Sequence, residues 1–150
     1  MEQERFFNFT RLIDGVHKSI LRLRLDKAPV FGVKGVHIFW VYELLQHPEG
    51  LSAAELAQRS QIDRSLISRE ISALKKEGYI ETADPDKPRN YKAKLVLTEK
   101  GVQAAKSIAS LGIQIQNRAS ADISEQDLEI FYATLEKLYH NLEKISEEKE

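Results

Sequence analysis

Both ends of the chain carry apolar side chains at alternating steps of three and four residues. This spacing predicts two amphipathic helices, each of which packs along another helix. Ser124 and Asp127 together form a capping-box-like start for the second one. The apolar positions are Phe6, Phe9, Ile13, Val16, Ile20 and Leu23 near the N-terminus, and Leu128, Phe131, Leu135, Leu138, Leu142 and Ile145 near the C-terminus.

The partner of these terminal helices has two interpretations. They pack together within one chain as a plain helical bundle, or they form the interface of a homodimer. We favour the homodimer, because the middle of the chain is too small to cover both apolar seams. A further helix, which Thr98 opens as N-cap, carries apolar residues at Ile108, Leu111 and Ile115.

The middle of the chain has a different pattern. Residues 35–46 are apolar on nearly every side, which predicts a buried helix that ends at the segment 47–50. Ser52 begins a capping box with Glu55 and starts a short helix that runs to about Ser60. Asp63 is the expected N-cap of a second helix over residues 64–77. Two short helices joined by a tight turn form a helix-turn-helix.

A β-hairpin follows the second helix, after Gly78. The expected strands are residues 79–82 and 91–97, and the turn between them contains Pro85 and Pro88. We therefore predict a mainly α protein with a small β-hairpin (α+β). A winged helix-turn-helix domain occupies residues 35–98, an N-terminal dimerisation helix and linker occupy 1–34, and C-terminal dimerisation helices occupy 99–150.

Composition narrows the class of protein. Apolar residues make up 42% of the 150 and charged residues 30%, which describes a soluble globular protein and excludes a disordered chain, a collagen and a membrane protein. The chain has no cysteine, which excludes disulfides, thiolate metal sites and a cysteine nucleophile. The acidic start lacks the features of a secretory signal, so we expect a cytoplasmic protein.

Charge is unevenly distributed along the sequence. Residues 59–94 contain nine basic and six acidic residues, a net charge of +3, whereas residues 121–150 have a net charge of −6. A basic middle beside an acidic tail is typical of a site for a polyanion. Ordinary variation between helix surfaces explains the same numbers equally well.

The helix over residues 64–77 carries the pattern most typical of nucleic-acid recognition. At about 100° per residue, one side of this helix is apolar and is formed by Ile67, Ile71 and Leu74. The opposite arc offers guanidinium and hydroxyl groups with no carboxylate, and Glu70 lies outside it. Such groups can bond base edges or phosphates in a major groove. The candidate reading residues are Arg64, Ser65, Ser68, Arg69 and Ser72.

The hairpin tip is a second candidate contact with nucleic acid. Four basic residues fall between positions 87 and 94, and Asp84 and Asp86 dilute their charge. A tip of this kind can reach phosphates or enter the minor groove. A hairpin that only adds solubility is the alternative. The candidate wing residues are Lys87, Arg89, Asn90 and Lys92.

Other kinds of site have less support. The four histidines lie far apart in sequence, and we expect them mostly at the surface or at interfaces, with no metal site and no cofactor. The sequence lacks a nucleophile elbow and a phosphate-binding glycine loop, so we expect no enzymatic activity. Six aromatic and histidine side chains could together line a pocket: Phe6, Phe7, Phe9, His17, Trp40 and Tyr42. However, aromatic residues in apolar helices belong to the hydrophobic core more often than to the wall of a pocket.

Four segments in order resemble the MarR family of bacterial transcription regulators: Leu56-Ala57, residues 63–69, residues 74–80, and residues 97–101. The resemblance covers the whole chain, because the terminal helices match that family's dimerisation layer. It implies a homodimer that binds a pseudo-palindromic DNA operator, most simply as a repressor, and is often released by a small effector. An aromatic or amphipathic molecule would suit the pocket walls.

The resemblance also assigns roles to residues. It implies that Arg64, Ser65, Ser68, Arg69 and Ser72 read the operator. The family's wing usually holds an Asp-x-Arg motif, and here residues 86–89 are one residue longer, with Arg89 as the arginine that enters the groove and Asn90 and Lys92 as its helpers. The alternative function is a winged-helix module that binds another protein and no specific DNA.

Overall fold

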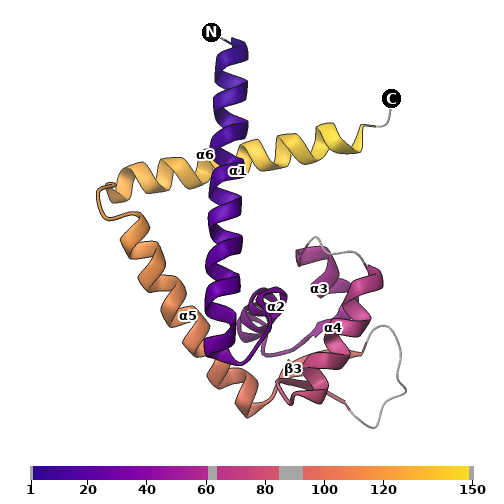
Figure 1. The fold of residues 1–150 in the computed structure, drawn as a ribbon. Coiled ribbons are helices and arrows are strands. Elements are labelled where there is room, and N and C mark those ends of the chain that lie inside the picture. Colours follow the sequence, from indigo (N-terminus) through magenta and orange to yellow (C-terminus); the bar gives the residue numbers. More distant parts are fainter. Residues whose placement is uncertain (1, 61–63, 85–92, 149–150) are drawn as a thin grey trace. The chain divides into compact units, whose positions relative to one another are not determined.

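The computed structural model describes residues 2–60, 64–84 and 93–148. The chain divides into two compact units, residues 1–110 and residues 111–150, and Figure 1 shows the elements of each. Within the described residues, no helix is both long and apolar enough to cross a bilayer.

The first unit contains most of the predicted elements. Its helices are α1 (Glu2–Lys27), the short 3-10 helix η1 (Ala28–Phe31), α2 (Gly35–Gln46), α3 (Ala53–Ser60), α4 (Arg64–Lys76) and the first half of α5 (Glu99–Ala119). The predicted helix-turn-helix is formed by α3 and α4, and Figure 1 shows α2 beside this pair. The predicted fold class, mainly α with a small antiparallel sheet, is confirmed.

The sheet has three antiparallel strands in the order β1-β3-β2. The predicted hairpin is β2 (Ile80–Thr82) and β3 (Lys94–Leu97), in which Ile80 lies opposite Leu97. The third strand, β1 (Leu51–Ser52), pairs with β3 and was not predicted from the sequence. Two residues are too few to show the alternation that identifies a strand.

The hydrophobic core of the first unit lies between α2, the helix-turn-helix and the sheet. Trp40, Val41 and Leu44 enter it from α2, and Ala105 and Ile108 enter it from α5. The other buried residues of this core are Val33, Leu51, Leu56, Ala57, Ile67, Ile71, Leu74, Tyr79, Ile80 and Leu95. The core therefore fixes the inner face of α4 and leaves its outer face free for contacts.

Helix α2 is less completely buried than its composition predicts. Val36 and Tyr42 are 36% and 40% exposed, although Trp40 on the same helix is fully buried. A helix packed at one side of a small domain keeps a solvent-facing side, whatever the composition of that side.

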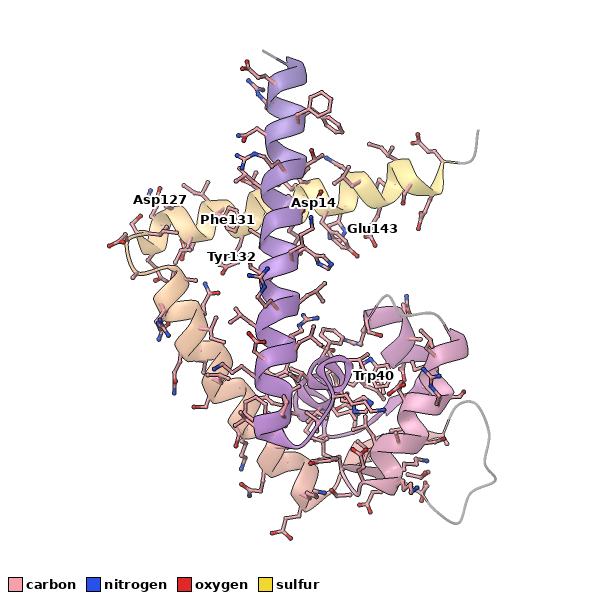
Figure 2. All side chains as sticks on the ribbon, viewed as in Figure 1. Asp14, Trp40, Asp127, Phe131, Tyr132 and Glu143 are labelled. Atoms are coloured by element: carbon pink, nitrogen blue, oxygen red, sulfur yellow. The ribbon has the colours of Figure 1, made fainter. Side chains whose placement is uncertain are left out.

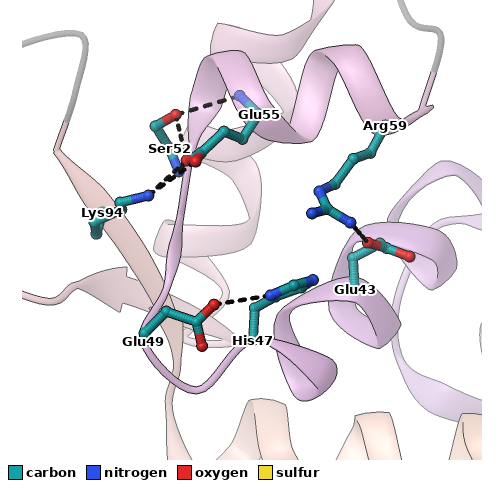
Figure 3. Close-up of polar contacts among 7 residues, drawn as sticks. All are labelled: Glu43, His47, Glu49, Ser52, Glu55, Arg59 and Lys94. Carbon is teal, nitrogen blue, oxygen red and sulfur yellow. Dashed lines mark hydrogen bonds and ion pairs between the residues drawn. The ribbon is translucent and has the colours of Figure 1, made fainter.

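Polar contacts fix the connection between α2 and α3 (Figure 3). The Ser52 hydroxyl accepts a hydrogen bond from the Glu55 backbone N–H at 3.2 Å, and the Glu55 carboxylate accepts from the Ser52 N–H at 2.7 Å. This confirms the predicted capping box and the N-cap role of Ser52. Arg59 pairs with Glu43 at 3.1 Å, which ties α3 back to α2.

Tyr79, between α4 and β2, is enclosed by two glycines. Its hydroxyl donates a hydrogen bond to the Gly32 carbonyl at 2.9 Å, and Gly32 has a φ of +69°. A Cβ added at Gly101, in the first turn of α5, would lie 2.0 Å from the Tyr79 carbonyl oxygen. Both positions therefore require glycine, because the chain segments that meet at Tyr79 approach too closely for a side chain.

The second unit consists of the later part of α5 and of α6 (Glu125–Glu147). Ser124 caps α6, because its hydroxyl accepts a hydrogen bond from the Asp127 N–H at 3.1 Å, as predicted. Gln116 of α5 donates to the Tyr132 hydroxyl of α6 at 2.7 Å, and the rings of Phe131 and Tyr132 meet edge to face (Figure 2).

Candidate nucleic-acid interface

Helix α4 has two contrasting faces. Ile67, Ile71 and Leu74 are at most 8% exposed and belong to the core. Ser68, Arg69 and Ser72 are exposed on the other side. Arg64 and Ser65 begin the helix, and their side chains lie outside the described residues. The described candidates therefore share one accessible surface, which we call the α4 outer face (Ser68, Arg69 and Ser72).

The α4 outer face has short side chains around one long cation. The Ser72 hydroxyl donates to the Ser68 carbonyl oxygen at 2.8 Å, which holds this side chain against the helix. The Arg69 side chain is 74% exposed. A helix with small residues on its outer face can approach the floor of a groove closely, with the arginine reaching farther than its neighbours.

The α4 outer face is contacted by Glu70. The helical pattern had placed this carboxylate outside the arc of candidate reading residues. Glu70 Oε1 accepts a hydrogen bond from Arg69 Nε at 3.3 Å. Glu70 Oε2 lies 2.9 Å from His37 Nε2 and 3.5 Å from Lys34 Nζ. We call these four residues (Lys34, His37, Arg69 and Glu70) the Glu70 cluster. The cluster joins the start of α2 to the middle of α4.

Burial and charge shift the titration of this cluster. The hydrogen bond from His37 is the largest cause that holds the pKa of Glu70 below its usual range, and the charge of Lys34 acts in the same direction. Desolvation is the largest effect on His37 and lowers its pKa, although Glu70 opposes that shift. The pair is therefore a neutral imidazole that donates its Nε2–H to an ionised carboxylate.

His37 is the exception to the expectation that the histidines lie mostly at the surface or at interfaces, because His17 and His140 are exposed and His47 is partly exposed. His37 is fully buried, and its ring stacks on that of Trp40 with centroids 5.9 Å apart. Sequence reasoning missed His37 and Glu70 because 33 positions separate them. The available signal was a histidine in an apolar helix together with a lone carboxylate beside Arg69.

The predicted wing residues Lys87, Arg89, Asn90 and Lys92 lie outside the described residues, as does the predicted N-cap Asp63. Lys94, which we counted among the basic residues near the tip, contacts Glu55 with a shortest distance of 2.7 Å (Figure 3). This contact is the largest cause that lowers the pKa of Glu55 to about 2. Lys94 therefore ties β3 to the start of α3.

Most residues of the predicted dimerisation seams are exposed to solvent in the single chain. On α1, Phe6, Ile13, Val16 and Ile20 are 38–59% exposed, and Phe9 is intermediate. On α6, Phe131, Leu138 and Leu142 are 39–53% exposed, whereas Leu128 and Leu135 are intermediate.

The six aromatic and histidine residues suggested as pocket walls do not share one environment. Trp40 is part of the core and is fully buried, and Figure 2 shows it within the first unit. Phe6 and Phe7 are 59% and 68% exposed. His17 and Tyr42 are exposed, and Phe9 is intermediate. Within the described residues, no group of three or more histidines and carboxylates could hold a metal ion.

One protein-family model matches the part of the chain that contains the helix-turn-helix. Residues 31–89 match the model described as the MarR family. This segment, which includes the helix-turn-helix, is therefore similar to the MarR family. The resemblance predicted from the sequence is thereby confirmed. No curated protein matches the sequence as a relative.

Solved MarR-family structures have the same fold over most of the chain. One is the S. aureus MepR–DNA complex, with 17% identity, a TM-score of 0.77, and coverage of 89% of this chain and 96% of that chain. Another is a putative MarR family regulator from Listeria monocytogenes in complex with a 26mer DNA, with 20% identity, a TM-score of 0.79, and coverage of 89% and 87%. A MarR regulator from Methanosarcina mazei has 18% identity, a TM-score of 0.77, and coverage of 91% and 90%. The chain therefore has the fold of MarR-family transcription regulators.

Proposed function

We propose that this protein is a sequence-specific DNA-binding transcription regulator that acts as a homodimer. The observation that carries the proposal is the α4 outer face. It is a solvent-exposed surface of one arginine and two serines on a helix whose opposite face is anchored in the core. Two of the solved MarR-family proteins with this fold were crystallised with DNA, which supports the same use of the fold here.

In this proposal α4 enters the major groove. Arg69 bonds a base edge through its terminal nitrogens, and Ser68 and Ser72 contact bases or phosphates. Arg64 and Ser65, at the start of the helix, extend the same contact. Leu66 is 44% exposed on α4 and offers an apolar contact for a thymine methyl group.

The wing is proposed to contact the same duplex beside the major groove. Lys94 is paired with Glu55 at the base of the hairpin, so the contact is assigned to Lys87, Arg89, Asn90 and Lys92. Cations at such a position bind the backbone or the narrow minor groove, where negative potential is concentrated.

The homodimer is proposed from the exposed apolar seams of α1 and α6. Most apolar side chains of these two seams are about half exposed in the single chain. Together they form a larger apolar surface than a monomer usually leaves in contact with water. Residues 35–98 are then the reading domain between dimerisation segments 1–34 and 99–150. Two-fold symmetry would place equivalent half-sites about 10 bp apart on a pseudo-palindromic operator.

Repression and release by an effector belong to the same proposal. A dimer that covers an operator acts most simply as a repressor. A small aromatic or amphipathic molecule that changes the separation of the two reading helices would release the DNA. We propose no enzymatic activity, cofactor or metal.

The proposal is tested by selecting bound sequences from a random pool of DNA duplexes with the purified protein. We expect enrichment of one sequence with two-fold symmetry, bound by two chains. A matched duplex with scrambled half-sites serves as the control and should bind far more weakly. If no sequence is enriched and binding is indifferent to the duplex, the protein is instead a winged-helix module for another protein.

A further inference from the structure

The hydrogen bond between Arg69 and Glu70 leaves the reading edge of the arginine free. Arg69 uses its Nε–H, the donor nearest the helix, to reach Glu70 Oε1 at 3.3 Å. A guanidinium has five N–H donors, so four remain on the two terminal nitrogens. A bidentate contact with guanine O6 and N7 can be made by these terminal nitrogens alone. The carboxylate therefore holds Arg69 from the protein side.

Glu70 can hold Arg69 in one orientation because Glu70 is itself fixed. Its side chain is only 12% exposed, and its second oxygen accepts a hydrogen bond from His37 Nε2 at 2.9 Å. His37 is fully buried in α2 and stacks on Trp40, which is also fully buried. The Lys34 ammonium, 3.5 Å from the same oxygen, balances the carboxylate charge. The orientation of the two oxygens is thus set by the core.

We propose that Glu70 is a positioning residue for Arg69 and thereby determines DNA specificity. This inference rests on the proposed function. An exposed arginine samples many rotamers, and binding to one base fixes a single rotamer at a cost in conformational entropy. A carboxylate locked by His37 restricts those rotamers before DNA arrives, so that less freedom is lost on binding. The same negative charge repels phosphates, which disfavours duplexes that offer Arg69 no base contact.

The test is a double-mutant cycle on DNA affinity. Glu70→Gln keeps the shape of the side chain and removes its charge. It is measured in the native sequence and in Arg69→Ala, on the selected duplex and on a random duplex. In the native background we expect Glu70→Gln to weaken binding to the selected duplex about fivefold or more. Binding to the random duplex should be unchanged or tighter. In the Arg69→Ala background the loss should disappear.

Two further variants make the test specific. Glu81→Gln removes an exposed carboxylate from β2 and serves as the matched control, with no selective loss expected. His37→Leu removes the hydrogen-bond donor to Glu70 Oε2 and leaves Glu70 in place, so it should reproduce the selective loss in smaller measure. If Glu70→Gln does not fold, as judged by thermal unfolding, His37→Leu measured in the two backgrounds provides the same cycle.

A merely structural role gives a different outcome. If Glu70→Gln weakens both duplexes equally, or weakens binding by the same factor with and without Arg69, Glu70 does not act through Arg69 and the inference is wrong. Failure of the proposed function is recognised separately, because the native protein would then fail to discriminate between the selected and the random duplex.

Discussion

At the residue scale, we expect Arg69 to contribute more to the recognition of bases than any other side chain that the structure describes. It is the only long cation of the α4 outer face as defined by the described residues, and its side chain is 74% exposed. Arg69→Ala should therefore weaken binding to the selected duplex by about 1–3 kcal/mol and affect random DNA much less. Fluorescence anisotropy titrations with both duplexes measure this difference. An equal loss on both would show that Arg69 contacts phosphate and reads no base.

His37 should make the stability of the fold depend on pH. Its pKa is lowered in the folded protein, mainly by burial, with Glu70, Lys34 and Glu77 as the charged groups that act on it. Below pH of about 6.5 the unfolded chain therefore takes up a proton that the folded chain resists. We expect the free energy of unfolding to fall as the pH drops from 7 towards 5. Urea unfolding at a series of pH values measures it.

The control for this prediction is the exposed histidine His140, whose side chain is 58% exposed. His37→Gln should flatten the decline in the free energy of unfolding between pH 7 and 5, whereas His140→Gln should preserve it. The lowered pKa of Glu70 adds a further loss of stability only below pH of about 4.5. A decline that persists unchanged in His37→Gln would contradict the assignment.

Helical periodicity predicted which face of α4 is buried, but it did not predict the polar contacts of that helix. A helical wheel separated Ile67 and Ile71 from Ser68 and Ser72 correctly, because 3.6-residue periodicity is a property of the helix alone. It could not show that Glu70 also contacts His37. That contact depends on how α2 packs against α4, which no local pattern contains.

At the element scale, the start of α5 is fixed by a close approach of two backbones. A Cβ at Gly101 would lie 2.0 Å from the Tyr79 carbonyl oxygen, whereas a Cβ at Gly112 on the same helix would meet no described atom within 4 Å apart from its chain neighbours and the nearby helix backbone. Gly101→Ala should lower the stability by about 2 kcal/mol or more, as overpacking does in a tight core. Gly112→Ala should raise it by up to about 1 kcal/mol through helix propensity.

Thermal and urea unfolding of these two variants test the account of α5 directly. A Gly101→Ala protein as stable as the native one would show that α5 does not press against Tyr79. Because both changes replace the same residue on the same helix, a difference between them reports packing and excludes a general effect of alanine.

Helix boundaries were the most predictable part of the fold. Ser52, Thr98 and Ser124 were recognised as N-caps because a hydroxyl followed by a free N–H is a local signal, and the structure shows all three bonds. The strand Leu51–Ser52 was missed because its pairing with β3 is a contact between distant segments. The strand expected over residues 91–97 is described only from residue 94.

At the scale of the whole molecule, the apolar seams of α1 and α6 predict the homodimer. Val16→Asp would place a carboxylate on the α1 seam, which a dimer would have to bury. An unpaired buried charge costs about 3 kcal/mol or more, and each dimer would carry two. We expect Val16→Asp to sediment as a monomer at micromolar concentration. Lys18→Asp, on the opposite side of the same helical wheel, should remain dimeric. Equal behaviour of the two variants would contradict this interface.

The central claim is that a basic surface of this protein binds the DNA backbone while α4 reads the bases. The salt dependence of binding to the selected duplex tests it most directly. Each phosphate contact should contribute about −0.9 to the slope of log K against log salt concentration. Several contacts per dimer therefore predict a slope steeper than about −3, with affinity falling sharply as salt rises. Affinity that stays constant over the same range of salt would contradict the account.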